Sequence, residues 1–279
     1  MKIKKFPKKL PGSFWGITTF FNPAGYKNKY ENYKIFRENL KKQGLKICAV
    51  EVAFSNRPFE LKKEDAEILI QIRGNEKNLM WQKERMMNIG LKNLPKDCDK
   101  IAWLDCDIIF ENQNWVKETS ELLEEYVVVQ PFSLCVWLPK NKIKIEIEKI
   151  PWGVMNGQKT NSRAYNYQKK EKKDLSTYIE AGHVGFAWVA RKEIFKKINF
   201  YDKTIIGSGD LFFIDAAYNR KMEKHFLEIS KKMKKDYLIW KKKMYMNTKG
   251  SVTFTKGNLF HLWHGDQNNR NYKKRHKIG

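Results

Sequence analysis

Short apolar runs alternate with amphipathic segments along the first half of the chain, and this order restricts the fold more than any other feature. Runs typical of buried strands cover residues 14–21, 45–54, 66–72, 100–110 and 126–130, and helical spacing covers 29–43, 77–91 and 115–125. A strand–helix–strand order of this kind predicts an α/β fold, with a mostly parallel central sheet that has helices on both faces.

The alternation stops after Pro131. Residues 134–178 are polar, basic and aromatic, and their pattern assigns no regular structure. We expect a strand at 182–191, a helix at 192–197, a helix from Asp210, a charged helix within 221–246, and a late strand or hairpin at 251–263. Because no stretch is rich enough in Gly, Ser or Pro to act as a linker, we expect residues 1–279 to form a single domain with two halves, 1–133 and 134–279.

The chain is strongly basic, with a formal net charge of +24 at pH 7. This charge favours an anionic partner, although a general lysine bias would produce the same count. The four cysteines have no paired spacing, which indicates reduced thiols in a cytosol-like compartment. No leader-like or membrane-spanning apolar segment is apparent. We therefore expect a soluble cytoplasmic protein whose basic surface suits contact with an anionic membrane.

Two carboxylates, Asp105 and Asp107, interrupt the apolar run at 100–110. In open α/β sheets ligands bind at the carboxyl ends of strands, where this pair is expected. Strand alternation would turn both aspartates to one face and Cys106 to the other. Such a pair suits a divalent cation that carries phosphate oxygens. The alternative is a strand end turning into solvent, with aspartate serving the turn.

Two further segments carry candidate groups. His261 and His264 end an apolar run, and their imidazoles suit a manganese-like ion that carboxylates also bind; the alternative is one buried and one exposed histidine. Asp210 follows Gly207-Ser208-Gly209 at the expected start of a helix. A carboxylate fixed there could act as a general base, or it could be a plain helix cap.

The helix before the carboxylates contains Lys83 and Arg85, which are candidates for contacts to a diphosphate or to a uridine, as is Arg73 after the preceding strand. The alternative is that these side chains are solvated and pair with neighbours such as Glu84.

In this order the motifs resemble those of GT-A nucleotide-sugar glycosyltransferases, in particular the β1,4-galactosyltransferase-like group. The likeness runs from about Trp15 to Arg270 and is weak between residues 134 and 180. The helix at 81–90 is similar to the family's Phe-Asn-Arg-Ala-Lys-Leu-Leu-Asn-Val-Gly element, and Asp105-Cys106-Asp107 to its Asp-Val-Asp. Residues 182–188 and Gly207-Ser208-Gly209-Asp210 resemble the segment that ends in Gly-Gly-Glu-Asp, and His261-Leu262-Trp263-His264 resembles Met-x-x-His.

The resemblance implies a role for each matched position. Asp107, His261 and His264 would bind Mn²⁺ or Mg²⁺, and Asp210 would be the catalytic base. Gly209 stands where the family has glutamate, which leaves the identity of the donor sugar open. The residues expected to bind the nucleotide sugar are Asp105, Trp81, Lys83, Arg73 and Thr18.

The implied reaction transfers a hexose from a UDP-sugar to a hydroxyl of a glycan or another acceptor, with inversion at the anomeric carbon. Residues 1–133 would bind the nucleotide sugar, and residues 134–279 would bind the acceptor. Aromatic side chains in the second half, Trp137, Trp152 and Tyr165, are candidates for stacking on the acceptor.

Three other functions fit some of the same residues. One is a retaining transferase, in which Asp210 orients the acceptor. Another is a basic nucleic-acid-binding module. The sequence has no recognisable basic-aromatic motif of such modules, so no nucleic acid is expected. The last is an inactive glycan-binding descendant, which would not need the retained acidic and histidine residues. The lysine bias suggests a bacterial or viral enzyme that builds a surface glycan.

Overall fold

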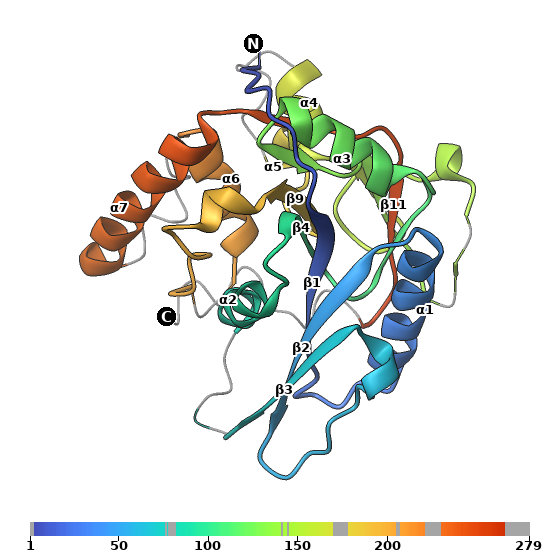
Figure 1. The fold of residues 1–279 in the computed structure, drawn as a ribbon. Helices are drawn as coiled ribbons and strands as arrows, with labels where there is room; N and C mark the ends of the chain where they lie inside the picture. The colour runs from blue at the N-terminus through green and yellow to red at the C-terminus, as the bar shows by residue number, and fades with distance from the viewer. Residues whose placement is uncertain are drawn as a thin grey trace.

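A twisted seven-stranded sheet forms the centre of the protein in the computed structural model shown in Figure 1. The structure describes residues 3–75, 77, 82–140, 142–143, 145–169, 178–204, 207–220 and 230–265.

The strands of the central sheet follow the order β10-β6-β9-β4-β1-β2-β3. Only β9 runs antiparallel to its neighbours β4 and β6, and the other neighbouring pairs run parallel. The mostly parallel sheet predicted from the sequence is therefore confirmed. The strands are β1 (Ser13–Phe21), β2 (Lys46–Phe54), β3 (Ile68–Gly74), β4 (Cys98–Leu104), β6 (Val128–Gln130), β9 (Ala187–Arg191) and β10 (Val252–Phe254).

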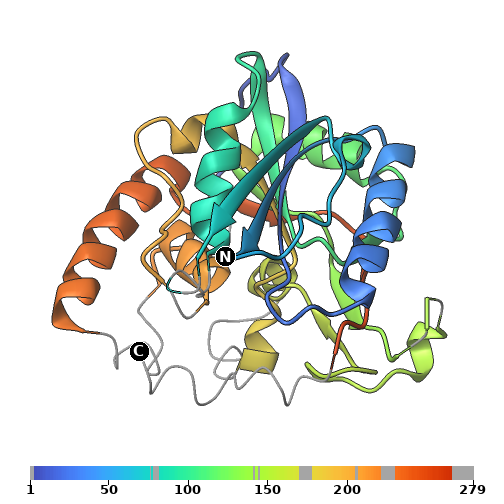
Figure 2. The same ribbon diagram turned by 90° about the horizontal axis from the view of Figure 1, so that it is seen from below.

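Helices cover both faces of this sheet, and Figures 1 and 2 show α1 and α7 on opposite sides of the molecule. The side chains of β4 explain the two layers, because Ile101 and Trp103 join one hydrophobic cluster while Ala102 and Leu104 join the other. Helices α1 (Asn28–Lys42) and α3 (Trp115–Glu125) pack on the second of these clusters. Helices α2 (Lys83–Asn93), α6 (Gly209–Ala217) and α7 (Lys231–Thr248) pack on the first.

A second, four-stranded sheet was not predicted from the sequence. Its order is β5-β11-β7-β8, with β5 (Ile108–Phe110), β11 (Asn258–His261), β7 (Leu134–Trp137) and β8 (Lys159–Asn161). All four of these strands have four residues or fewer, and most of their partners are distant in the chain, so no local periodicity marks the sheet.

The second sheet corrects two predictions. The apolar run at 100–110 is two strands, β4 and β5, which belong to different sheets and are separated by Asp105-Cys106-Asp107. The run at 251–263 is no hairpin, because β10 lies in the central sheet and β11 in the second one. Continuous apolar sequence marks burial, and it does not show where a chain leaves one sheet for another.

Several boundaries also differ from the predictions. The strand expected at 182–191 begins only at Ala187, because Gly182 (φ 87°) and Phe186 (φ 78°) have left-handed backbone conformations. The helix expected at 192–197 is a short 3₁₀ turn, η5 (Lys192–Phe195). Parts of the helices expected at 77–91 and 221–246 lie outside the described residues. The remaining short elements are η1 (Lys63–Asp65), η3 (Ile147–Lys149), α4 (Arg163–Lys169) and α5 (Tyr178–Ala181).

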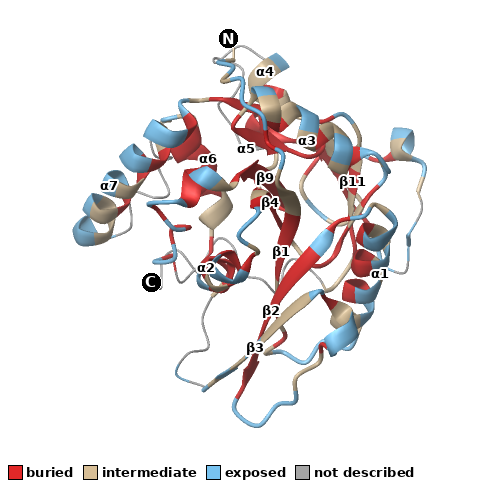
Figure 3. Cartoon of the chain, in the orientation of Figure 1, coloured by how far each residue is buried: buried red, intermediate tan, exposed pale blue. Residues whose placement is uncertain are grey.

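Burial follows the layers, with the strands of the central sheet mostly buried and the outward sides of α1 and α7 exposed (Figure 3). Among the described residues, no helix combines the length and the apolar character that crossing a membrane requires.

Candidate active site

Asp107, His261 and His264 meet at one point, although more than 150 residues separate the aspartate from the histidines in the chain. His264 Nε2 lies 3.2 Å from Asp107 Oδ2, and His261 Nε2 lies 3.6 Å from Asp107 Oδ1. One ligand atom from each of the three residues lies within 4.8 Å of the others. One carboxylate and two imidazoles form a donor set that suits a manganese-like divalent cation. The three predicted metal ligands are therefore close enough to bind one ion.

The second sheet explains why these residues converge. Strand β5 pairs antiparallel with β11, with His261 opposite Ile108, and the Leu262 amide donates to the Asp107 carbonyl at 2.8 Å. The turn that carries His264 is held from the other side by helix α1. There, Asn28 and Asn32 both donate side-chain hydrogen bonds to the Trp263 carbonyl, at 3.0 and 3.1 Å.

A stack of rings packs behind the histidines. The Phe186 ring lies on His261, with centroids 4.8 Å apart and planes 25° apart, and it also contacts His183 at 4.2 Å. Burial lowers the pKa of His183 well below its usual value, with the neighbouring His261 adding to the effect, so His183 is neutral at pH 7. No local sequence pattern distinguishes His183 and Phe186, because their contacts with His261 are between residues distant in the chain.

Lys83 joins the two aspartates on the other side of the site. Its ammonium lies 2.7 Å from Asp105 Oδ1 and 3.0 Å from Asp210 Oδ2. Burial disfavours the charged form of this buried lysine, but Asp105, Asp210 and Glu84 together raise its pKa well above the usual value. Lys83 therefore stays charged and links the end of β4 to the start of α6. The solvated alternative for this side chain is excluded.

Asp210 lies in the first turn of α6, and Ser208 occupies the N-cap position. The backbone reaches this helix through two left-handed residues, Gly207 (φ 94°) and Ser208 (φ 75°), a conformation that favours glycine. The plain cap considered from the sequence is therefore wrong for Asp210. Its carboxylate accepts a hydrogen bond from Lys83 and lies near the N-terminus of the helix, where the helix dipole stabilises a negative charge.

Glu84 is a fourth acidic group in the site, where the sequence predicted only an ordinary ion-pair partner for the neighbouring lysine and arginine. It is 4 % exposed, and a Cβ atom at position 209 would come within 1.8 Å of its Oε1. Gly209 is thus required by the close approach of this carboxyl group. Burial raises the pKa of Glu84 to about 8, with Lys83 opposing and Asp210 adding to the shift, so Glu84 is mostly protonated at pH 7.

The charges of the site favour a cation. Asp105, Asp107 and Asp210 are three carboxylates, and Lys83 is the ammonium that contacts two of them. Asp107 is 6 % exposed and faces two imidazoles. A buried carboxylate needs a cation or hydrogen-bond donors beside it, and a divalent cation held between Asp107 and the two imidazoles would serve that need. Cys106 points away from the site into the hydrophobic cluster beneath it.

The other predicted donor-binding residues have different positions. Thr18 is buried and donates through Oγ1 to the Leu104 carbonyl at 2.9 Å, so it supports the strand end that carries Asp105. Arg73 is exposed, donates to the Ser55 carbonyl at 3.1 Å, and lies over the Phe59 ring at 4.3 Å from its centroid. Trp81 lies outside the described residues.

The three aromatic candidates for the acceptor also differ. Trp137 is 3 % exposed and packs edge-on against His183 and Phe186, so it offers no free face for stacking. Trp137 lies at the end of β7, a mostly buried strand that the sequence did not predict. Tyr165 packs against Phe254 with centroids 5.1 Å apart. Trp152 is 61 % exposed, with the Lys159 ammonium 5.3 Å from its ring, and its indole is accessible.

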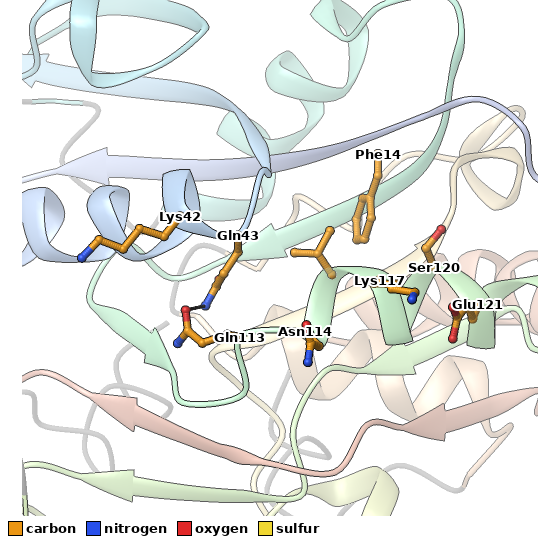
Figure 4. A pocket seen from close by; sticks show the side chains of 9 residues that line it. Phe14, Lys42, Gln43, Gln113, Asn114, Lys117, Ser120 and Glu121 are labelled. Atoms are coloured by element: carbon orange, nitrogen blue, oxygen red, sulfur yellow. Dashed lines mark hydrogen bonds between the residues drawn. The ribbon is translucent and has the colours of Figure 1, made fainter.

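A hollow of about 540 Å³ lies elsewhere, between the C-terminal end of α1 and the N-terminal part of α3 (Figure 4). Its wall includes Phe14 at the start of β1, whereas Asp105 follows the end of the parallel strand β4. The hollow therefore lies at the amino ends of the parallel strands, whereas the acidic site lies at their carboxyl ends. Its charged side chains are of both signs, Lys42, Lys117 and Glu121. Its lining contains no histidine and no cluster of carboxylates like that of the acidic site.

Comparisons by sequence find no family model that matches the chain and no matching protein among curated ones. Comparison by structure finds glucosyl-3-phosphoglycerate synthase from Mycobacterium tuberculosis, solved with Mn²⁺, UDP and phosphoglyceric acid. It has a TM-score of 0.50 and 10 % identity, over 96 % of this chain and 75 % of that one.

Two other structures have lower scores. S. aureus TarS 1–349 has a TM-score of 0.43 at 10 % identity over 89 % of this chain, which spans 60 % of the length of that structure. The catalytic domain of Drosophila β1,4-galactosyltransferase 7 has a TM-score of 0.34 at 14 % identity, over 86 % of this chain and 63 % of that one. With the sheet order and the likeness to the mycobacterial synthase, the chain has the GT-A fold of nucleotide-sugar glycosyltransferases.

Proposed function

We propose that the protein is a metal-dependent glycosyltransferase that moves a hexose from a UDP-sugar to a hydroxyl group of a glycan or another acceptor, with inversion. The observation that carries this proposal is the convergence of Asp107, His261 and His264 beside Asp105, Lys83 and Asp210. The fold supports it, since the ends of parallel strands are the usual ligand sites of open α/β sheets.

Asp107, His261 and His264 would hold Mn²⁺ or Mg²⁺, and their spacing and donor atoms fit such an ion. When bound, the ion would supply positive charge next to the diphosphate of the donor. The mycobacterial synthase of similar fold was solved with Mn²⁺ and UDP, which supports this choice of cofactor and nucleotide.

Asp210 is the proposed general base. Its carboxylate takes the proton of the acceptor hydroxyl while the hydroxyl oxygen forms a bond to the anomeric carbon. The bond from that carbon to the diphosphate oxygen breaks, and the electron pair leaves with UDP. Attack from the face opposite to UDP inverts the anomeric configuration. Positioned carboxylates of this kind contribute about 10²- to 10⁴-fold to such reactions.

Lys83 has two proposed roles. Its contact with Asp210 holds that carboxylate in place at the start of α6, and its contact with Asp105 fixes the carboxylate expected to meet the nucleotide sugar. Thr18 and Arg73 remain proposed residues for binding the nucleotide sugar. Thr18 would act indirectly, by holding the end of β4 that precedes Asp105. Trp152 is the proposed acceptor-stacking residue with an accessible ring.

We also propose that the chain acts as one domain. The site draws Lys83, Asp105 and Asp107 from the first half, and Asp210, His261 and His264 from the second. Residues 1–133 would therefore bind the nucleotide sugar only together with the metal-binding turn near the end of the chain.

The test is a screen of nucleotide sugars for hydrolysis and a calorimetric titration with UDP, each with and without Mn²⁺. Asp107→Ala should abolish metal-dependent UDP binding and leave the protein folded. Asp202→Ala, which removes an exposed aspartate that is not one of the proposed metal ligands, is the matched control and should bind normally. Unchanged binding by Asp107→Ala would refute the proposed site.

The stereochemistry has its own test. If Asp210 orients the acceptor and does not abstract its proton, the enzyme is a retaining transferase. Proton NMR of the first product formed from a donor of known anomeric configuration distinguishes inverting from retaining transfer. An inverted anomer is expected, and a retained one would exclude the proposed role of Asp210.

A further inference from the structure

Helix α7 presents a basic face with apolar side chains at its centre. Of its eighteen residues seven are lysines and one is acidic, Asp236, which pairs with Lys203 at 2.6 Å. Lys241 is buried and donates to the Arg220 carbonyl, and the other lysines line the outer part of the helix. Figure 3 shows this side of α7 exposed at the edge of the molecule.

The opposite side of α7 is fully used in packing. Tyr237 donates its hydroxyl to the Phe212 carbonyl at 3.0 Å, and Thr248 donates to the Ala217 carbonyl at 3.1 Å, so this side is fixed to α6. Since these bonds set the rotation of the helix, the exposed face is a stable feature of the fold.

Large apolar side chains lie on that exposed face. Ile239 is 53 % exposed, Met246 63 % and Leu238 45 %. Lys232, Ile239 and Met246 are spaced by two helical turns and so point the same way. Exposing three such side chains together has no benefit for folding, because each would be more stable out of water.

Neighbouring segments extend the charge of this face. The Asn247 side chain donates to the Ile194 carbonyl at 3.2 Å, and the Trp240 indole donates to the Asn199 carbonyl at 2.8 Å. These bonds place the turn at 196–199, with exposed Lys196 and Lys197, along the flank of α7. Lysines from two elements thus surround the apolar centre.

We propose that this α7 face docks the protein on the surface of an anionic phospholipid bilayer. Interfacial helices combine lysines for the headgroups with apolar side chains that enter the boundary of the acyl chains. Nucleic acid is the less suitable partner, because single strands are bound by exposed aromatic rings, and the exposed centre here is aliphatic.

Sedimentation with lipid vesicles tests the proposal. The protein should bind vesicles of phosphatidylcholine with 30 % phosphatidylglycerol and should not bind vesicles of phosphatidylcholine alone. Replacing Lys232, Lys235, Lys242 and Lys243 by glutamine should weaken binding at least ~100-fold, given the contribution of each lysine near a charged surface. The control replaces four exposed lysines near α1, namely Lys34, Lys41, Lys42 and Lys46, and should bind nearly as the wild type.

The apolar centre has a separate readout. Ile239→Ser/Met246→Ser should bind at low salt and be released at a lower salt concentration than the wild type, because the charge is kept and the inserted side chains are lost. All variants should keep their thermal unfolding midpoint and metal-dependent UDP binding, since no changed residue belongs to the active site. Normal UDP binding with no vesicle binding would overturn only this proposal.

Three other results would overturn it as well. One is equal loss of binding by the two lysine variants, and another is equal binding of neutral and anionic vesicles. The third is tighter binding of a single-stranded RNA probe than of anionic vesicles, with the same dependence on the α7 lysines.

Discussion

Asp210 and Asp105 share one buried ammonium, Lys83, and this contact defines the acidic side of the site. The sequence predicted both aspartates and the lysine as functional residues. It could not predict that they touch, because Lys83 is separated from Asp210 by 127 positions and meets it only through the packing of α2 beside α6.

Asp210→Asn should keep donor binding and lose transfer. Asparagine retains the shape and the acceptor oxygen toward Lys83 but cannot take a proton, so kcat should fall about 10²- to 10⁴-fold with little change in UDP affinity. Steady-state kinetics beside calorimetry measures both quantities. Near-normal turnover would exclude Asp210 as the base.

Glu84→Gln should change how stability depends on pH. The pKa of Glu84 rises from an unfolded value near 4.5 to about 8 in the folded protein. Between these values the folded state keeps a proton that the unfolded state has released, so the free energy of unfolding falls as pH rises. Glutamine is always neutral and removes this contribution.

The free energy of unfolding of Glu84→Gln should therefore rise relative to that of the wild type from pH 5 to pH 8, by as much as about 4 kcal/mol. Urea unfolding at several pH values measures it, and comparison of the two proteins cancels the other titrating groups. Parallel stability curves over this range would show that Glu84 is not held protonated.

Gly209→Ala should be destabilising because of Glu84. The added methyl group would lie 1.8 Å from Glu84 Oε1, and overpacking of this kind costs about 1–3 kcal/mol. In a Glu84→Ala background the same change should be neutral or stabilising, since alanine is the better helix former. A double-mutant cycle by urea unfolding measures the coupling, and additive effects would contradict the close contact.

At the level of elements, the small sheet determines the position of the proposed metal ligands. Pairing of β5 with β11 places His261 beside the residues that follow Asp107, and α1 holds the next turn through Asn28 and Asn32. The sequence predicted α3 to the residue and β1 nearly so, because their periodicity is local. It missed the second sheet, whose pairings depend on distant partners.

Asn28→Ala/Asn32→Ala should weaken Mn²⁺ binding while leaving its ligands intact. Both amides hold the Trp263 carbonyl between the two histidines, and groups that orient ligands typically contribute 10- to 100-fold to metal affinity. We expect a loss of about 10-fold by calorimetry. Asn93→Ala, which removes an exposed helical contact on α2, is the control, and equal affinities for both variants would contradict this role.

For the whole molecule, the alternation of strands and helices was sufficient to predict an α/β fold with a mostly parallel sheet. The net charge of +24 favoured an anionic partner, but a general lysine bias gives the same count, so the charge alone identified no partner and no binding surface. Charge counts carry no position, whereas the structure shows that lysines gather on α7 around Ile239 and Met246. The protein thus carries a candidate cation site formed by both halves of the chain and a separate basic face.

Anomalous diffraction from crystals grown with Mn²⁺ and UDP would locate the ion relative to Asp107, His261 and His264. We predict one manganese peak within coordination distance of the Asp107 carboxylate and the imidazoles of His261 and His264, with the UDP diphosphate beside it. A manganese peak elsewhere, or UDP bound at the carboxyl ends of the strands with no ion between those three side chains, would show that they do not form a metal site.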